Sequence, residues 1–389
     1  MMKVFVAATL CLAAAAQDKV DQAAIDRAID KGIEYLKPKA IKRQDVELVL
    51  WTFLHAGVPE TDPALQKLLR TCLEDPIWKH EREFTYNIVL LTLCLQKLDA
   101  VRYQPVIAQC GQFFVDTQCE TGQWAYGESW KPTPEFEAAL KKALDKSASA
   151  PAKPPKGGKA PTIPTVKIQR GPGAIAEKEG DNSNSQYAAL GIRACADAGV
   201  LLPEDTLRRA KAWWEKDQKP DGSWGYGENP RDAGYGSMTG GAIGSLSILD
   251  SVLKLDPRKN ARIAKGFEWV GQNFSVTDNP RGPRAAAKPE HLYYHLYSLE
   301  RAGDLTGTDK IGTHAWYPEG ARELVGTQKA DGSWQGASAE TDIWGTCFAI
   351  LFLKRATQPL PHIRTGDERS SPSPKDETPE KGDSPFRKK

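Results

Sequence analysis

Four polar stretches of this chain carry side chains that could transfer a proton or hold a ligand. They are Asp181-Asn-Ser-Asn-Ser-Gln186, Tyr235-Gly-Ser-Met-Thr239, His291-Leu-Tyr-Tyr-His-Leu-Tyr297 and Glu340-Thr-Asp342-Ile-Trp344. Carboxylates and imidazoles can act as general acids or bases. Amides, hydroxyls and aromatic rings suit a sugar, a peptide or an apolar chain. Each stretch opens a segment with helical spacing, so helix capping is the competing, structural interpretation.

The candidate catalytic groups are two carboxylates, Asp342 and Asp181. Asp181 begins a run of six polar side chains, whereas one helix cap needs only one. We therefore regard Asn182, Asn184 and Gln186 as candidate ligand-binding residues. Asp342 stands in the first turn of its helix, where an acid is favoured by the helix dipole. Trp344, two residues later, is a further candidate for ligand contact.

The other two stretches supply the remaining ligand-binding candidates, Tyr235, Thr239, His291, Tyr294 and His295. The two histidines are four residues apart and share one helical face. Such a pair can bind a metal ion, but no Glu lies between them as in zinc proteases. Core packing is the favoured interpretation. The cysteines show no zinc-type spacing either, so we predict neither a metal nor a cofactor.

A turn that occurs three times indicates which elements position these stretches. Its copies are Gln118-Cys-Glu-Thr-Gly122-Gln-Trp124, Gln218-Lys-Pro-Asp-Gly222-Ser-Trp224 and Gln328-Lys-Ala-Asp-Gly332-Ser-Trp334. Glycine allows a tight turn at positive φ, and Gln can bind backbone groups exposed at a helix end. Trp can cover the junction with a large apolar surface. We interpret the Gln, Gly and Trp of each copy as structural and the turn as a sign of repeated helical hairpins.

The apolar spacing predicts twelve helices that pair in order into six hairpins. The predicted segments are 21–36, 44–56, 63–75, 83–97, 103–117, 183–199, 204–217, 237–254, 260–273, 290–303, 317–328 and 340–356. The second member of each pair is apolar nearly all round, as a buried helix should be. We therefore expect an all-α fold, an α/α toroid with the second members inside. An open solenoid is the alternative.

Three segments fall outside this pattern. Residues 129–180 are rich in Pro, Lys, Ala and Gly, and show helical amphipathicity only near 134–146, so we expect a flexible, basic, disordered insertion. Residues 359–389 form a mixed-charge Pro/Ser stretch that we expect to be a disordered tail. Residues 1–16 read as a signal peptide. The toroid domain is then expected over 17–128 and 181–358.

Composition narrows the possible partners and the compartment. Lys3 followed by an apolar run and Ala14-Ala-Ala16 predicts an exported protein, periplasmic or secreted. No apolar stretch is long enough for a transmembrane segment. A formal net charge of +2 gives no reason to expect nucleic acid. The six cysteines beyond Cys11 are mostly in apolar helical segments, where buried free thiols are expected.

The three turns resemble the QW repeats of the terpene cyclase and protein prenyltransferase superfamily, which includes squalene-hopene cyclases. The resemblance extends over about residues 20–357 and implies an α/α toroid. The cyclases use an Asp-x-Asp-Asp acid, but Asp250, Asp256, Asp278 and Asp342 stand alone here. The prenyltransferases bind zinc through an Asp-x-Cys pair and a later His, whose place is taken by Gly345. Both known reactions are therefore disfavoured.

Three functions remain open. The first is an exported binding or scaffold protein, which the missing acid motif and zinc ligands favour. The second is a terpene cyclase-like enzyme acting on an isoprenoid or another lipid through an unrecognised acid. The third is a carbohydrate-active enzyme, such as a polysaccharide lyase, on the same kind of toroid. A closed apolar chamber would favour a lipid ligand, an open polar groove would favour a sugar, and a filled centre would favour a scaffold protein. The partner is therefore expected to be an unknown small molecule, either a lipid or a sugar, or another protein.

Overall fold

The computed structural model describes residues 21–80, 85–127, 130–147, 163–171, 177–227, 233–282, 291–336 and 340–360. These residues are mostly helical. The α-helices are α2 (Gln22–Leu36), α3 (Val46–Ala56), α4 (Pro63–Glu74), α5 (Thr85–Asp116), α6 (Pro134–Ser147), α7 (Asn182–Asp197), α8 (Glu204–Asp217), α9 (Gly236–Val252), α10 (Ala261–Gln272), α11 (Leu292–Thr306), α12 (Trp316–Thr327) and α13 (Asp342–Leu353). Short 3-10 helices are η1 (Arg43–Asp45), η2 (Ile77–Lys79) and η3 (Pro257–Lys259), and two-residue strands are β1 (Val166–Lys167) and β2 (Val200–Leu201).

Helix α5 is two helices in succession. Asp99 lies between them in an extended conformation, with φ −167° and ψ 96°. Its carboxylate accepts hydrogen bonds from the backbone N–H groups of Val101 and Arg102, as an N-cap does. The first half of α5 therefore completes one hairpin with α4, and the second half begins the next hairpin. The described helices thus form the six hairpins that the sequence predicts.

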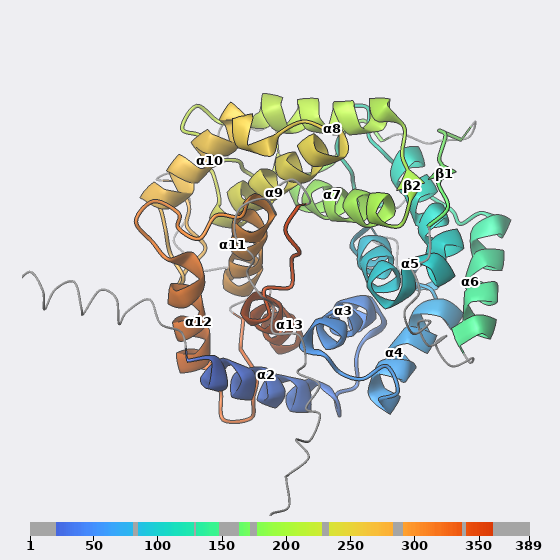
Figure 1. Cartoon of the computed structure of the whole chain (residues 1–389), viewed down its shortest axis with the longest axis horizontal. Coiled ribbons are helices and arrows are strands. Elements are labelled where there is room, and N and C mark those ends of the chain that lie inside the picture. Colours follow the sequence, from blue (N-terminus) through green and yellow to red (C-terminus); the bar gives the residue numbers. More distant parts are fainter. Residues whose placement is uncertain are drawn as a thin grey trace, which may run out of the picture.

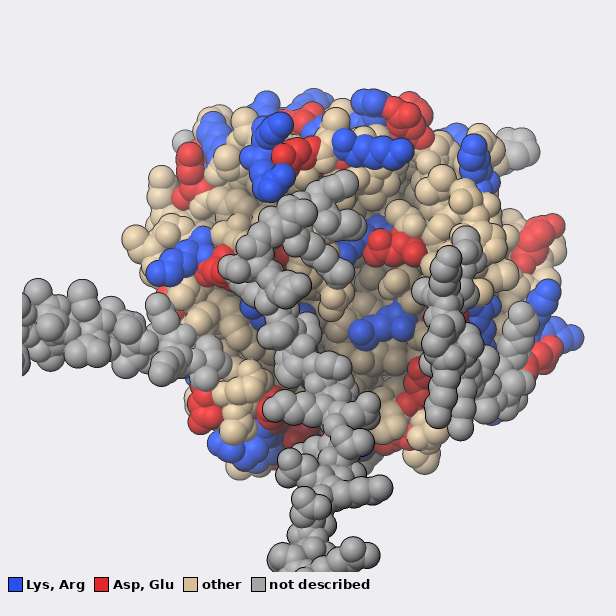
Figure 2. All heavy atoms as spheres, viewed as in Figure 1, with Lys and Arg blue, Asp and Glu red and all other residues tan. Residues whose placement is uncertain are grey.

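The hairpins close into two concentric rings, which confirms the predicted toroid. Figure 1 shows α3, α7, α9, α11 and α13 around the centre, with α2, α4, α8, α10 and α12 outside them. Burial follows the same division. Helix α9 is buried from Gly236 to Asp250, whereas α2 buries one stripe that includes Ile25, Ile29 and Ile33. On the face seen in Figure 2, Lys and Arg alternate with Asp and Glu around the rim.

The repeated turn fastens each outer helix to the next one. In the second copy, the Gln218 amide donates to the carbonyl oxygens of Gly222 at 3.0 Å and of Arg262 in α10 at 2.9 Å. Gln118 bridges its own turn to Thr206 in α8 in the same way. We expected this amide to bind an exposed helix end. It instead reaches a carbonyl within the following outer helix.

The tryptophan of each copy joins the outer layer to the inner one. The indole N–H of Trp224 donates to the carbonyl of Trp214 at 2.8 Å, and its backbone N–H donates to the Thr239 hydroxyl on α9 at 3.1 Å. The ring itself is fully buried. The same two bonds recur in the other copies, Trp124 with Phe114 and Ser185, and Trp334 with Leu324 and Thr346.

The third copy closes the ring. The Gln328 amide donates to the carbonyl of Ala28 in α2 at 2.8 Å, although the two residues are 300 positions apart. Gly332 has φ +90°, and a β-carbon added to it would lie 2.3 Å from the carbonyl oxygen of Lys31. Only glycine allows the turn to approach α2 so closely. The chain is therefore a closed toroid and not an open solenoid.

The sequence predicts a flexible insertion at 129–180, but its described residues include a packed helix and a short strand. Helix α6 packs on α4 and α5, because its apolar residues Phe136, Leu140 and Ala143 lie on one face and are buried. The Phe136 ring lies 4.9 Å from Trp78, between ring centroids. Strand β1 pairs in parallel with β2, with Val166 opposite Val200. Residues 129, 148–162 and 172–176 of the insertion, the signal peptide and residues 361–389 of the tail lie outside the described residues.

The end of the described chain crosses the ring at the C-terminal ends of the inner helices (Figure 1). Thr357 donates from its backbone N–H and its hydroxyl to the two carboxylate oxygens of buried Glu300, both at 2.8 Å. The Arg193 guanidinium donates to the carbonyls of Gln358 and Pro359. Leu360 is buried. This segment covers the ring on that side.

Two further predictions from the sequence concern the cysteines and membrane-spanning helices. Cys72, Cys94, Cys110, Cys119, Cys195 and Cys347 are all buried free thiols, as predicted. No helix in the described part of the chain has the length and apolar character needed to cross a bilayer.

Candidate functional site

A cavity of about 390 Å³ lies at the centre of the ring, at the N-terminal ends of the inner helices. Its walls come from η1, α3, α5, α7, α11 and α13 and from the loops that hold Tyr126 and Tyr226. The sequence predicted that ligands would meet these helix ends. The two sides of the cavity differ in chemistry.

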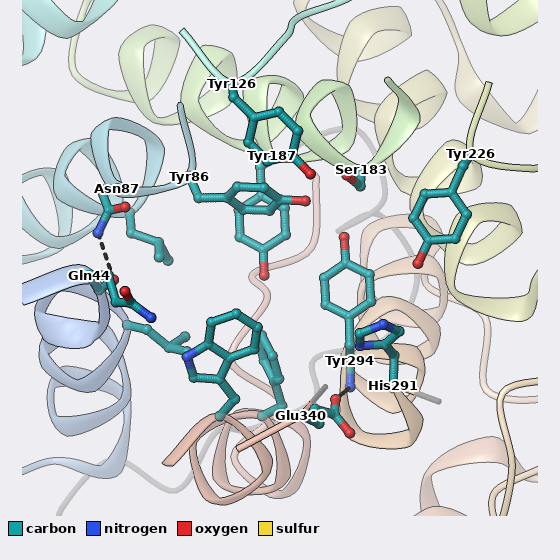
Figure 3. A pocket seen from close by; sticks show the side chains of 14 residues that line it. Gln44, Tyr86, Asn87, Tyr126, Ser183, Tyr187, Tyr226, His291, Tyr294 and Glu340 are labelled. Carbon is teal, nitrogen blue, oxygen red and sulfur yellow. Dashed lines mark hydrogen bonds between the residues drawn. The ribbon is translucent and has the colours of Figure 1, made fainter. Parts of the chain in front are cut away.

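One side of the cavity combines apolar side chains with two amides, Gln44 and Asn87, which Figure 3 shows on the side away from Tyr226 and Tyr294. Leu48, Leu90, Trp344 and Phe348 line it. The indole N–H of Trp344 donates to the carboxylate of Asp45 at 2.7 Å, which fixes the ring. Burial raises the pKa of Asp45, and the bond from Trp344 opposes that rise. This side offers a flat aromatic surface beside aliphatic side chains, which suits an apolar ligand body.

The other side carries hydroxyl groups that converge on the cavity. Figure 3 shows the phenol groups of Tyr86, Tyr126, Tyr226 and Tyr294 directed inward, with Ser183 beside them. The rings of Tyr187 and Tyr294 are parallel within 2°, and their centroids are 6.1 Å apart. Burial raises the pKa of Tyr226 to about 12 and that of Tyr294 well above its usual value, so both remain neutral phenols. Neutral phenols can donate as well as accept hydrogen bonds.

Glu340 is the one carboxylate among the described residues that line the cavity. Its oxygens accept the backbone N–H groups of Tyr294 at 2.8 Å and Tyr293 at 3.3 Å. It thereby caps α11, whose own N-cap residue, His291, has φ +62° and gives no side-chain cap. Burial raises the pKa of Glu340 to about 7, against the two N–H bonds that lower it. The group is thus partly protonated at neutral pH.

A buried polar relay supports the hydroxyl side from behind. The Arg301 guanidinium donates to the Gln186 side-chain oxygen at 2.6 Å, and the Gln186 amide nitrogen lies 2.7 Å from the Tyr294 hydroxyl. The guanidinium also lies over the rings of Tyr297 at 4.5 Å and Tyr187 at 5.3 Å. Arg301 is 2% exposed, so its charge acts in a largely water-free interior.

Three of the sequence-predicted residues line the cavity: His291, Tyr294 and Trp344. Gln186 lies directly behind it, bonded to Tyr294. Tyr235 stands next to the wall, where its ring lies 5.2 Å from that of Tyr226. The His291 and His295 pair is divided between two environments. His295 is buried against the carbonyl of Ser275, and burial lowers its pKa to about 4.

The other predicted residues have structural partners. Asn182 accepts from Trp213 and donates to Asp217, and Thr239 binds the backbone of Trp224. Asp181 caps α7 and accepts from Ser183 and twice from Asn184. Asp342 begins α13, and its carbonyl accepts from Thr346. Neither Asp181 nor Asp342 lines the cavity. Among the described residues, no three His, Cys, Asp or Glu side chains cluster as metal ligands would.

Glu340 and the tyrosines from separate segments are the residues that sequence reasoning missed. Tyr126 and Tyr226 share a position two residues after the tryptophan of a repeated turn, a signal that could have found them, whereas Tyr86 and Tyr187 lie on separate inner helices with no common motif. Glu340 stands two residues before Asp342 in a stretch that the sequence did single out. The available signal was its position ahead of a nearly all-apolar helix, where an acid is expected to be partly buried.

Comparison with known proteins finds similarity only among solved structures. No protein-family model matches the chain, and no curated protein is significantly similar to it. A solved structure of a single-residue variant of the type II terpene cyclase MstE from Scytonema, in complex with the product merosterolic acid A, is similar over 86% of this chain and 97% of that one. The sequence identity is 12% and the TM-score is 0.38.

Proposed function

We propose that this chain is a binding protein that holds a small organic molecule in the centre of the ring. The observation that carries the proposal is the mixed lining of the cavity, with apolar residues Leu48, Leu90, Trp344 and Phe348, the amides of Gln44 and Asn87, and a group of tyrosine hydroxyls. A ligand with a flat apolar body and an oxygen-bearing edge would match both sides. The cavity has a volume of about 390 Å³, which lies within the range of small-molecule binding sites. The N-terminal apolar run supports export of the chain as part of the proposal.

The open cavity favours binding over a purely scaffolding role. A scaffold toroid would fill its centre with packed side chains, because interiors reach the density of organic crystals. Here large aromatic rings surround the space, and Tyr187 and Tyr294 stand parallel at its wall. Holding phenol groups around an empty volume gives up packing contacts, which a ligand would restore.

General-acid catalysis by Glu340 is a second candidate function, favoured by its pKa of about 7. The same value argues against protonation of an alkene, because burial makes Glu340 a weaker acid. Cleavage of a sugar usually requires two carboxylates across the substrate, and Glu340 alone is found among the described lining residues. Binding therefore remains the function that the geometry supports best.

Extraction of bound molecules would test the proposal. The purified chain is compared with two variants by native mass spectrometry and solvent extraction. Leu48→Trp places an indole in the cavity, whereas Leu255→Trp adds the same group at a surface leucine that is 44% exposed. We expect a small molecule to accompany the parent and Leu255→Trp but not Leu48→Trp. Equal recovery from all three folded proteins, or recovery from none, would contradict the proposal.

A further inference from the structure

We infer that the ligand of the central cavity is an organic carboxylate whose anionic group accepts a hydrogen bond from the Tyr294 hydroxyl. This inference rests on the proposed binding function and names the chemical class of the ligand. It comes from the charge of Arg301, from the direction of the relay that ends at Tyr294 and from the division of the cavity into two sides.

The first observation is a buried cation that forms no direct ion pair, although the carboxyl group of buried Glu300 attracts it from nearby. Among the described residues, no carboxylate lies within ion-pair distance of Arg301, and its Nη1 has no hydrogen-bond partner. Burial of an unpaired charge is costly, and buried ions in proteins are usually paired. The faces of Tyr187 and Tyr297 compensate only part of that cost. An anion bound in the adjacent cavity would add negative charge near the guanidinium, beyond the attraction from Glu300.

The second observation is the direction of the relay. A guanidinium can only donate, so the Gln186 atom at 2.6 Å from it must be the amide oxygen. The Gln186 nitrogen then donates to the oxygen of Tyr294 at 2.7 Å. The phenol proton of Tyr294 is left to point elsewhere, and Figure 3 shows that hydroxyl directed into the cavity. Tyr294 thus presents to the ligand a donor polarised by Arg301.

The third observation limits the kind of anion. Neither Lys nor Arg is found among the described lining residues, so the charge of Arg301 acts through the wall and not by direct contact. The one lining carboxylate, Glu340, accepts two backbone N–H bonds, and burial raises its pKa, which lessens its repulsion of an anion. A phosphate or sulfate would bring more charge and hydration than one polarised phenol can replace. A single carboxylate on an apolar body fits better. Leu48, Leu90, Trp344 and Phe348 would then hold the body opposite Tyr294.

Three matched probes test the charge preference: 2-naphthoate, 2-naphthamide and 2-naphthylmethylammonium. They share one flat ring system and differ in being anionic, neutral and cationic. Binding is measured by calorimetry on the full chain. We expect the carboxylate to bind at least tenfold more tightly than the amide, and the ammonium to bind most weakly. An amide that binds as well as the carboxylate, preference for the ammonium, or no binding of any probe would overturn the inference.

The variant Tyr294→Phe tests the route of the interaction. It removes the phenol proton but keeps the ring against Tyr187, so the fold should persist and can be checked by circular dichroism. We expect the carboxylate-to-amide preference to fall to about one, because the carboxylate loses the donor polarised by Arg301. A preference that survives in Tyr294→Phe would overturn the role of Tyr294. Recovery of a neutral molecule in the extraction experiment would overturn the carboxylate inference and leave the binding function standing.

Discussion

Gly332 provides the sharpest test of how the ring is closed, because the chain contains a matched control. Gly57 ends α3 with φ +84°, and a β-carbon added there would meet nothing within 4 Å. Gly57→Ala should therefore cost only the strain of a left-handed alanine, about 1–2 kcal/mol. Gly332 has nearly the same φ, +90°, but its added β-carbon would lie 2.3 Å from the Lys31 carbonyl oxygen.

The extra cost of Gly332→Ala comes from moving the turn away from α2. The bond between Gln328 and the Ala28 carbonyl would break, at about 1 kcal/mol. The Trp334 ring, which packs beside Gly32 and Ile350, would lose part of its packing, at about 1–2 kcal/mol. We expect a total destabilisation of about 3–5 kcal/mol, against about 1–2 kcal/mol for Gly57→Ala.

Equilibrium urea denaturation, followed by tryptophan fluorescence and circular dichroism, measures both variants. The dependence of the free energy of unfolding on urea concentration should be the same in the variants and the parent. A difference in midpoint then gives the difference in the free energy of unfolding. Gln328→Ala should give an intermediate loss, because it removes the bond without the clash. If Gly332→Ala and Gly57→Ala shift the midpoint equally, contact between this turn and α2 does not stabilise the ring.

Three further predictions concern the cavity, the thiols and the insertion. The pKa of Glu340 in the folded protein, about 7, lies above its ordinary value of 4.5, so its contribution to stability is complete below about pH 4.5 and is lost as the pH rises through 7. Glu340→Gln should remove this pH dependence of the free energy of unfolding, which amounts to up to roughly 3 kcal/mol. Denaturation midpoints at pH 5 and pH 7.5 measure it. Burial raises the pKa of Cys110 and Cys347 to about 12 and that of Cys119 to about 11, so iodoacetamide should label these thiols only after the protein unfolds. Peptide mass spectrometry detects the label, and labelling of the native protein would contradict the burial of these thiols. Phe136→Ala, which removes a buried ring between Trp78 and Trp130, should release α6 from α4 and α5 and make 130–147 sensitive to proteases, whereas Glu135→Ala on the same helix should not.

The architecture was predictable because its signals are local. A Gly that needs positive φ, a Gln four residues before it and a Trp two residues after it specify one turn, and three copies specify a repeat. The target of the Gln amide was not predictable, since the carbonyls of Thr206, Arg262 and Ala28 become neighbours only once the hairpins are stacked.

The cavity was predictable only in part. Tyr294 and Trp344 were found because they open inner helices, but Asp342 and Glu340 looked equivalent two residues apart. Their difference is tertiary, since Glu340 turns back to cap α11 whereas Asp342 stays in the first turn of its own helix. The sequence predicts a ligand site in the polar run after Asp181, yet Asn182 donates to Asp217 in α8 and Asn184 donates to Asp181 in the cap of its own helix.

The insertion shows how composition can outweigh a correct local signal. The amphipathic stripe of Phe136, Leu140 and Ala143 is visible in the sequence, but the surrounding Pro and Lys residues favoured disorder. What orders α6 is the aromatic surface formed by Trp130, just before the helix, with Trp78 from η2 and Phe113 from α5, which are distant in sequence. No window of sequence contains that surface.

The bond between Gln328 and α2 also bears on how the protein is made. A nascent chain presents α2 first, yet the partner of that helix is synthesised some 300 residues later. Until then the stripe of Ile25, Ile29 and Ile33 has only half of its covering, which leaves an early product prone to aggregation. A circular permutant with its termini moved to the loop between α8 and α9 would instead deliver α12, α13, α2 and α3 consecutively, and the ring would then close last between α9 and its neighbours α7 and α8.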